Sequence, residues 1–436
     1  MQDTPPRASE ATPELGRATL TKVGWRLLPF LLLLYVVAWL DRVNIGFAAL
    51  QMNADMGFSN TVYGFGAGIF FIGYALFEVP SNLVLARVGA RLWIARIMIT
   101  WGVLSVAMMF MAGPISFYVL RFLLGVAEAG FLPGIIYYLG NWYPAKDRAR
   151  AVSWFMLAIP LSTVVGGPLA GVILELDGWH GLQGWQWLFL LEGAPAVVLG
   201  FIVLGYLTDS PDKAKWLDPA QRHWLVERMA SEQRAAQARH GVGLGAALLH
   251  PTVWLLGFVL FACQTGSYGL TLWIPQIVRG LSGLSDFAVS MISALPYVAA
   301  SIGMILIGAS SDRTGERFLH IAIPSAIGGL GFIASAYFTS PWPAMIALTF
   351  AAVGDLGTRG PFWSLPTRFL TGSAAAAGIA LINTMASLGG FVGPSMVGVV
   401  LDYTDSFAGG LVFLAVLLLL AAGATLALRR AAVLAD

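Results

Sequence analysis

The chain has 436 residues, of which 58% are hydrophobic and only 11% are charged, and its net charge is +2. A soluble protein carries about 25% charged residues, so this composition excludes an ordinary soluble domain. The mean hydropathy of +0.76 instead favours a polytopic membrane protein. The single cysteine, Cys263, excludes an internal disulfide and a cysteine-based metal cluster.

Residues 1–22 are polar and lack the apolar core of a signal peptide, so we expect the first helix to stay in the membrane. Twelve apolar segments of about 20 residues or more follow, each long enough to cross a bilayer as a helix. They cover residues 23–50, 60–86, 91–111, 115–139, 150–174, 186–207, 252–278, 286–310, 318–338, 342–366, 373–401 and 407–430. The sequence therefore predicts an all-α polytopic membrane protein with twelve transmembrane helices.

A polar stretch divides these segments six and six. It carries mixed charges, with apolar residues at helical spacing after a proline, which predicts a surface helix. The predicted organisation is a cytoplasmic tail (1–22), a six-helix bundle (23–207), a cytoplasmic linker (208–250), a second six-helix bundle (251–430) and a short cytoplasmic tail (431–436).

The basic residues predict the orientation. Alternate connections, together with the two chain ends, hold 21 of the 25 lysines and arginines, and the opposite connections hold none. By the positive-inside rule, both termini are expected in the cytoplasm. Arg279 is the one basic residue near the opposite side, and we expect it to be a plain periplasmic-end residue.

Three arginines lie inside apolar segments, each near an acid in the sequence. Adjacent Asp41 and Arg42 project about 100° apart on a helix, so each is expected to face a different neighbour. Arg121 and Glu128 are two turns apart on one face, and Gly125 between them leaves room for a ligand or another backbone. An ionised group at bilayer depth costs about 2.5–3.5 kcal/mol on insertion scales, so it usually lines a cavity and has a partner. Such a cavity could hold an anion and couple it to protons; permanent ion pairs between helices are the alternative.

A short sequence repeat relates the two halves. The segment "NLVLARVGAR" (82–91) follows the second helix, and "GASSDRTGER" (308–317) follows the eighth. The chain here resembles the major facilitator superfamily, whose signature at both places is G-x-x-x-D-R-x-G-x-R. The second copy matches, including Asp312 and Arg313, which the resemblance assigns to gating. In the first copy Asn82 replaces the glycine and Ala86 the acid, which puts a charge relay there in doubt.

Within that superfamily the chain is similar to the anion:cation symporter family, which carries tartrate, phthalate, sugar acids and aromatic acids. The resemblance implies that Arg42 and Arg121 bind the anion and that Asp41 and Glu128 carry protons. It further implies that Tyr74 hydrogen-bonds the substrate and that Trp363 and Asn383 line the C-terminal half of the cavity, although Asn383 could instead hold two helices together. Five motifs in order carry it: "WLDRVNIGFA" (39–48), "GYALFEVPSN" (73–82), "RFLLGVAEAGFLPG" (121–134), "GPFWSLP" (360–366) and "AAAAGIALINTMASLGGFVGP" (374–394).

The seventh segment, "CQTGSYGLTLW" (263–273), contains glycines that favour a discontinuous, ligand-facing helix. Gln264 and Tyr268 are its candidate substrate ligands; simple packing is the alternative for Tyr268. Glu78, near the cytoplasmic end of the second helix, is expected to serve helix packing or gating. Asp355 and Arg359 stand at i, i+4, the favourable order for an intrahelical ion pair. Alternatively, Arg359 anchors the substrate from the C-terminal half.

The sequence thus predicts a proton-coupled symporter that imports an organic carboxylate by alternating access; an exchanger or exporter of the same fold is the alternative. We expect no enzymatic activity, because the five histidines form no catalytic constellation. No Walker-type phosphate-binding loop is present in the sequence, which argues against an ATP-driven pump. The expected partners are a small organic anion and the bilayer, without nucleic acid, metal or cofactor other than the coupling protons. A monomer in a bacterial inner membrane is expected.

Overall fold

The computed structural model describes residues 13–237, 250–366 and 372–435. In these ranges the chain is built from α-helices and short 3₁₀ turns. The α-helices are α1 (Pro13–Met56), α2 (Asn60–Val88), α3 (Ala90–Ala107), α4 (Pro114–Glu128), α5 (Phe131–Gly140), α6 (Ala145–Met156), α7 (Ala158–Leu174), α8 (Gly184–Tyr206), α9 (Pro219–Gln237), α11 (Pro251–Ser282), α12 (Asp286–Thr314), α13 (Leu319–Tyr337), α14 (Pro341–Leu356), α15 (Arg359–Trp363), α17 (Gly372–Thr404) and α18 (Phe407–Ala435).

Ten helical segments in the described ranges are long and apolar enough to cross a membrane, with α4 and α5 forming one of them. The fifth and tenth predicted segments are present but divided, into α6 and α7 and into α14 and α15. The predicted all-α membrane fold is confirmed. The expected surface helix of the linker is α9, and linker residues 238–249 lie outside the described ranges.

The position of the helix breaks differs from the sequence prediction. The glycine-rich seventh segment was expected to be discontinuous, but α11 runs without a break from Pro251 to Ser282. Its glycines serve packing instead, since a Cβ on Gly269 would lie 2.7 Å from Leu414 of α18. The fourth segment breaks at Gly130, whose φ of +85° favours glycine, and the tenth breaks between Leu356 and Arg359. An arginine or an acid therefore stands beside the break in each of these two segments.

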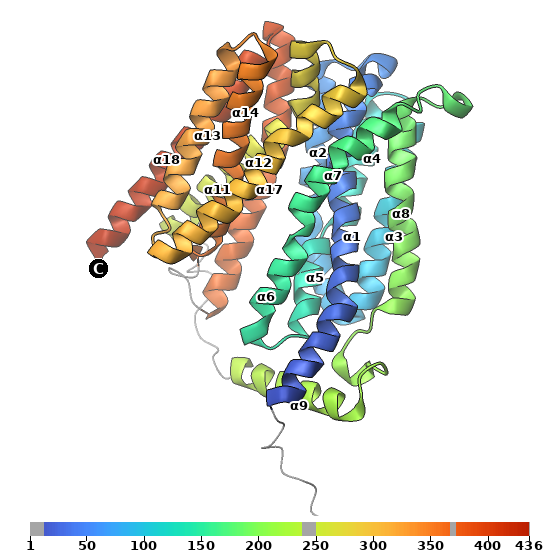
Figure 1. Cartoon of the computed structure of the whole chain (residues 1–436), viewed down its shortest axis with the longest axis vertical. Coiled ribbons are helices and arrows are strands. Elements are labelled where there is room, and N and C mark those ends of the chain that lie inside the picture. The colour runs from blue at the N-terminus through green and yellow to red at the C-terminus, as the bar shows by residue number, and fades with distance from the viewer. Residues whose placement is uncertain (1–12, 238–249, 367–371, 436) are drawn as a thin grey trace, which may run out of the picture.

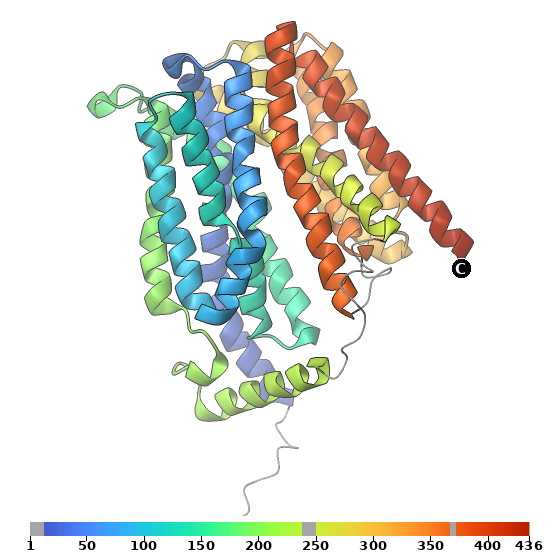
Figure 2. The ribbon, with the colours of Figure 1, turned by 180° about the vertical axis from the view of Figure 1, so that it is seen from behind.

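The helices form two groups that stand side by side (Figures 1 and 2). We call the end where α1 begins and α9 lies the linker end, and the opposite end, where α1 passes into α2, the loop end. The groups meet along α2 with α17, α7 with α12, and α1 with α11.

Glycines let the two groups approach closely near the loop end. A Cβ on Gly64 of α2 would lie 2.4 Å from the carbonyl oxygen of Pro394 on α17, and one on Gly167 of α7 would lie 2.5 Å from that of Ser290 on α12. Contacts this short exclude larger residues, as at close crossings of membrane helices. The halves are therefore packed backbone to backbone at this end.

Hydrogen bonds between the groups also concentrate at the loop end. The carboxylate of Asp402 on α17 accepts from the backbone N–H groups of Asn60 (3.1 Å) and Thr61 (2.7 Å), the first two residues of α2. A carboxylate at a helix N-terminus satisfies free N–H groups and complements the helix dipole. Gln51 of α1 donates to Asp286 of α12 at 2.9 Å, and the Tyr63 hydroxyl donates to the carbonyl of Leu272 at 2.6 Å. The structure is thus a state that is closed at the loop end.

The two signature turns use different acids. After α12, Arg317 forms an ion pair with Asp312 of its own motif. After α2, where Ala86 stands in the acid's place, the backbone N–H of Arg91 donates to Asp209, which follows α8, at 3.0 Å. The Arg91 guanidinium lies 3.8 Å from the same carboxylate. The acid missing from the first motif is therefore supplied by a residue that is distant in sequence.

Candidate functional site

The centre of the molecule holds an ion pair between α1 and the end of α4. The Arg42 guanidinium forms an ion pair with Glu128, and it donates a hydrogen bond of 3.4 Å to the Tyr268 hydroxyl on α11. Only 10% of the Arg42 side chain and 1% of the Glu128 side chain are exposed. Arg42 therefore links an acid of the N-terminal helix group to a tyrosine of the C-terminal group.

Arg121 does not pair with Glu128, although the two lie on one face of α4. Its guanidinium donates instead to the backbone carbonyls of Gly66 (3.4 Å) and Ala67 (3.1 Å) on α2. The space at Gly125 is filled by another backbone and not by a ligand, since a Cβ there would lie 2.0 Å from the carbonyl oxygen of Phe70. α2 therefore crosses α4 at Gly125, which brings the carbonyls of α2 within reach of Arg121.

Asp41 faces away from Arg42, as their adjacent positions predict. Its carboxylate accepts hydrogen bonds from Trp101 and Ser105 of α3 and from Asn44 at 3.1 Å. Both oxygens are thus occupied by donors, and the side chain is buried. The sequence analysis did not single out Trp101 or Ser105; a polar serine and an indole one turn apart in an apolar helix are the signal that could have found them.

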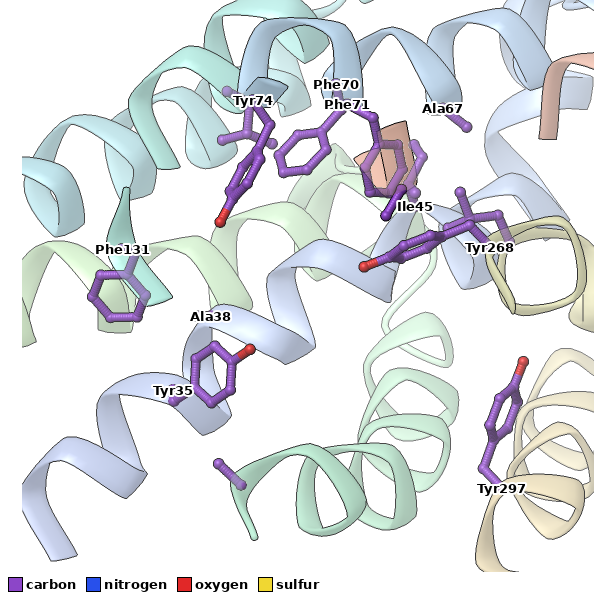
Figure 3. Packing of buried hydrophobic residues seen from close by; sticks show 14 of the residues in the cluster. Tyr35, Ala38, Ile45, Ala67, Phe70, Phe71, Tyr74, Phe131, Tyr268 and Tyr297 are labelled. Carbon is purple, nitrogen blue, oxygen red and sulfur yellow. The ribbon is translucent and has the colours of Figure 1, made fainter. Parts of the chain in front are cut away.

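Aromatic side chains surround the two arginines. The Cζ atom of Arg42 lies 5.2 Å from the Tyr74 ring centre and 5.6 Å from that of Phe70, while Arg121 lies 5.0 Å from the same Phe70 ring. These distances allow cation–π attraction. In Figure 3 the hydroxyls of Tyr74, Tyr268 and Tyr35 point toward the same space beside α1. Tyr35 was missed by sequence analysis because nothing in its motif separates it from core tyrosines.

We call Arg42, Arg121 and Glu128, with the aromatic rings around them, the arginine–acid cluster. Each of the three charged side chains has one buried polar atom without a hydrogen-bond partner within the described residues: Arg42 Nε, Arg121 Nη1 and Glu128 Oε2. An unsatisfied buried polar atom costs about 1–3 kcal/mol, and more on a charged group. The carboxylate of a bound anion would supply hydrogen-bond acceptors for the two arginines. A proton on Glu128 would neutralise the acid and make it a hydrogen-bond donor. The cluster therefore has unused capacity for an anion and for a proton.

A second arginine–acid pair stands at the break in the tenth segment. Arg359 Nη2 lies 3.6 Å from Asp355, and it donates to Ser267 of α11 at 2.6 Å, while Ser267 in turn donates to Asp355. Because α14 ends at Leu356, the pair spans a helix break and is not the regular intrahelical pair that the spacing suggested. Asp355 is buried with one oxygen unpartnered in the described residues, and 17% of the Arg359 side chain is exposed.

The remaining candidates lie outside this centre. Asn383 on α17 donates to both carboxylate oxygens of Glu78 on α2, at 2.8 and 3.0 Å, which joins the two helix groups nearer the linker end. Trp363 is 41% exposed on α15, with its ring 5.5 Å from that of Phe362. Gln264 is half-buried on α11. The substrate roles predicted for Asn383, Trp363 and Gln264 stay predictions.

Arg279 has a more definite place than a plain periplasmic-end residue. It forms an ion pair with Asp286, the first residue of α12, and Asp286 also accepts from Gln51 of α1. Arg279 therefore supports a contact that joins the two helix groups at the loop end.

Comparisons with known proteins agree with this architecture. A family model described as Major Facilitator Superfamily matches residues 31–394. A protein from Agrobacterium vitis, named "Putative tartrate transporter", is 53% identical over 96% of each chain. A "Quinolone resistance transporter" from Acinetobacter baumannii is 45% identical over 93% of this chain and 94% of its own length.

The fold is also shared with solved structures. A bacterial homologue of the human lysosomal transporter Spinster, in an inward-facing and occupied conformation, superposes with a TM-score of 0.77. At 18% identity, over 93% of this chain and 96% of that one, the likeness shows the fold alone. The family match covers most of the chain, so the superfamily resemblance seen in the sequence is confirmed. The chain belongs to the Major Facilitator Superfamily and is a membrane transporter.

Proposed function

We propose that this protein is a proton-coupled symporter that imports an organic carboxylate. The observation that carries the proposal is the buried Arg42–Glu128 pair, which leaves Arg42 Nε and Glu128 Oε2 without partners among the described residues. An anion that binds Arg42 weakens the hold of the arginine on Glu128, and this favours protonation of the acid. Anion and proton would then bind together, which is the requirement for symport.

The contacts between the helix groups support alternating access. With the linker end on the cytoplasmic side, as the basic residues predict, the observed state is closed toward the periplasm by Asp402, Gln51 and Tyr63. The Glu78–Asn383 bond joins the groups on the cytoplasmic side of the cluster. Both sets are formed in this state, so rocking of the two groups about Arg42 would open one end by breaking its contacts while those at the other end hold. Neutralisation of the arginine–acid cluster by anion and proton would permit the movement.

Uptake into proteoliposomes tests this proposal. With an alkaline interior, a pH difference of about one unit supplies about 1.4 kcal/mol per proton, enough for up to about tenfold accumulation of a substrate that enters with one proton. Tartrate is the first substrate to use, because a relative that is 53% identical is named for it. Counterflow without accumulation under the gradient would contradict symport.

An exchanger or exporter is the second candidate, favoured by the similarity to a protein named for quinolone resistance. Export would need a substrate that leaves against its gradient when protons enter. Inside-out vesicles with an acidic lumen, loaded with a labelled fluoroquinolone or tartrate, distinguish the two directions. An importing symporter would carry the label out of the vesicles together with protons, whereas a proton-driven exporter would retain it. The same arginine cluster would serve either, so the direction of coupled flux is the deciding measurement.

Replacement of Arg359 tests whether the substrate binds through a second carboxylate. If its guanidinium binds a second carboxylate from the C-terminal group, Arg359→Gln will weaken uptake of tartrate at least about 30-fold, since losing one buried charged contact costs about 2 kcal/mol or more. Uptake of a matched monocarboxylate would change little. Equal loss of both substrates would show that Arg359 only holds Asp355 and Ser267. The comparison of KM values for the two substrates in each variant is the measurement.

Asp402 provides a test of the loop-end closure. Asp402→Ala removes the acceptor for the two N–H groups of α2, so we expect the populations to shift toward a state open at the loop end. Spin labels at Ala112 and Tyr403, with Cys263 replaced by serine, would report this as a longer distance. Asp405→Asn, at a second exposed acid just after α17 whose positive φ asparagine also adopts, is the matched control. An unchanged distance distribution in Asp402→Ala would show that glycine packing alone closes this end.

A further inference from the structure

A groove of about 940 Å³ lies at the linker end. Its lining comes from the start of α1, the start of α6 and one face of α9, and these helices lie together at this end of the molecule (Figure 1). Leu32 is the lining residue of α1 nearest to the central cluster, and ten residues of helix, about 15 Å, separate it from Arg42. The groove is therefore a separate feature from the arginine–acid cluster.

The chain holds the groove in shape with specific contacts. Gly16 lets α9 approach α1, since a Cβ there would lie 2.7 Å from the Trp224 ring. Lys22 of α1 pairs with Asp218 at 3.2 Å. The carboxylate of Glu232 on α9 accepts from the backbone N–H of Ala145, the first residue of α6, at 2.9 Å. Three elements that are distant in sequence are thus fixed together around the groove.

The polar rim of the groove is positively charged. Arg17, Lys146 and Arg150 line it, all three are exposed, and none pairs with an acid within the described residues. Arg228 also lines it but is paired with Glu232 at 3.3 Å, and Asp147 is the one acid of the lining. The excess positive charge favours an anionic ligand.

A buried hydroxyl faces the same space. Tyr143 lines the groove and is 5% exposed, and its hydroxyl has no hydrogen-bond partner within the described residues. Burial raises the pKa of Tyr143, so the hydroxyl stays protonated and is available as a donor. A ligand that enters the groove would therefore need an acceptor oxygen at this depth.

Most of the remaining lining is apolar. Leu28, Pro29 and Leu32 form its wall, and Trp25 and Trp154 flank it with 79% and 53% of their surface exposed. Exposed tryptophans are typical of the level where lipid headgroups meet acyl chains. The groove thus offers cations and a hydroxyl donor beside an apolar wall.

We propose that this groove binds an anionic phospholipid. Its phosphate group would lie among Arg17, Lys146 and Arg150 and accept from the Tyr143 hydroxyl, while an acyl chain would follow the apolar wall of α1. The site depends on membrane insertion of the chain and not on the substrate or coupling ion of the transporter.

The test measures lipid binding to the purified full-length protein by native mass spectrometry. We expect dioleoyl phosphatidylglycerol to stay bound where dioleoyl phosphatidylcholine is lost. The triple variant Arg17→Gln, Lys146→Gln and Arg150→Gln removes three cations, each worth about 1 kcal/mol near an anionic headgroup, so affinity should fall about fivefold per cation. Tyr143→Phe removes only the hydroxyl donor and keeps the shape of the ring, and it should also lower the affinity for phosphatidylglycerol.

The matched control removes three exposed cations outside the groove lining: Arg87→Gln, Lys213→Gln and Arg430→Gln. Equal loss of phosphatidylglycerol in this control would overturn the proposal in favour of general surface charge. Displacement of the lipid by inorganic phosphate at low millimolar concentration would show a free-phosphate site, and displacement by tartrate an anion exit site; either result overturns it. Unchanged melting temperatures of both triple variants, with selective loss in the first, would support it.

Discussion

Arg121→Gln is expected to abolish measurable binding of the carboxylate substrate while the protein still folds. Arg121 is 1% exposed and leaves Nη1 unpartnered within the described residues, so it holds a desolvated positive charge ready for an anion. Loss of one partner from a buried charged contact costs about 2–5 kcal/mol, which is at least about a 30-fold increase in Kd. A glutamine amide nitrogen takes the place of the arginine Nε, so it can still donate to the carbonyl of Gly66, which preserves part of the contact with α2.

Isothermal titration of the purified protein with tartrate is the measurement, and Arg121→Lys should keep part of the affinity as a point charge. Ser81→Ala is a matched control, because it removes a 2.9 Å hydrogen bond between α2 and α3 at Trp93 without touching the cluster. If Arg121→Gln lowers the melting temperature but binds tartrate normally, Arg121 is a brace between helices and not an anion ligand.

Sequence analysis predicted the helices and the charged positions well, because both depend on local patterns. Apolar length alone located the twelve segments, and the cost of burying a charge marked Arg42, Arg121 and Glu128. The different neighbours of Asp41 and Arg42 followed from the 100° step between adjacent helical residues. These inferences need no knowledge of which helices touch.

What could not be predicted is pairing across the fold. The choice of Glu128 for Arg42 depends on how α1 packs beside the end of α4. The choice of carbonyls on α2 for Arg121 depends on the crossing of α2 and α4 at Gly125. Replacement of the missing motif acid by Asp209 likewise depends on where α8 ends. The break expected in α11 was wrong because a glycine in a membrane helix can serve close packing as well as a turn.

The structure also distinguishes the two acids that the sequence analysis predicted as proton sites, Asp41 and Glu128, by their hydrogen bonds. Both oxygens of Asp41 already accept hydrogen bonds, from Trp101, Ser105 and Asn44, so a proton there would have to displace a donor. Glu128 has Oε2 without a partner in the described residues. Of the two proposed proton sites, Glu128 therefore has the geometry to gain and lose a proton without rearrangement of its neighbours.

Glu128→Gln is expected to uncouple substrate transport from the proton gradient. Glutamine can still accept from Arg42, so the cluster keeps its shape and the substrate can bind, but no proton is taken up or released. The variant should retain tartrate counterflow in proteoliposomes and lose the accumulation, up to about tenfold per proton, that one pH unit drives in the native protein. Glu78→Gln, which alters an acid bonded to Asn383 nearer the linker end, should keep that accumulation. If Glu128→Gln accumulates tartrate normally and Asp41→Asn does not, the coupling proton resides on Asp41, and the hydrogen bonds from α3 must then break and re-form in each cycle.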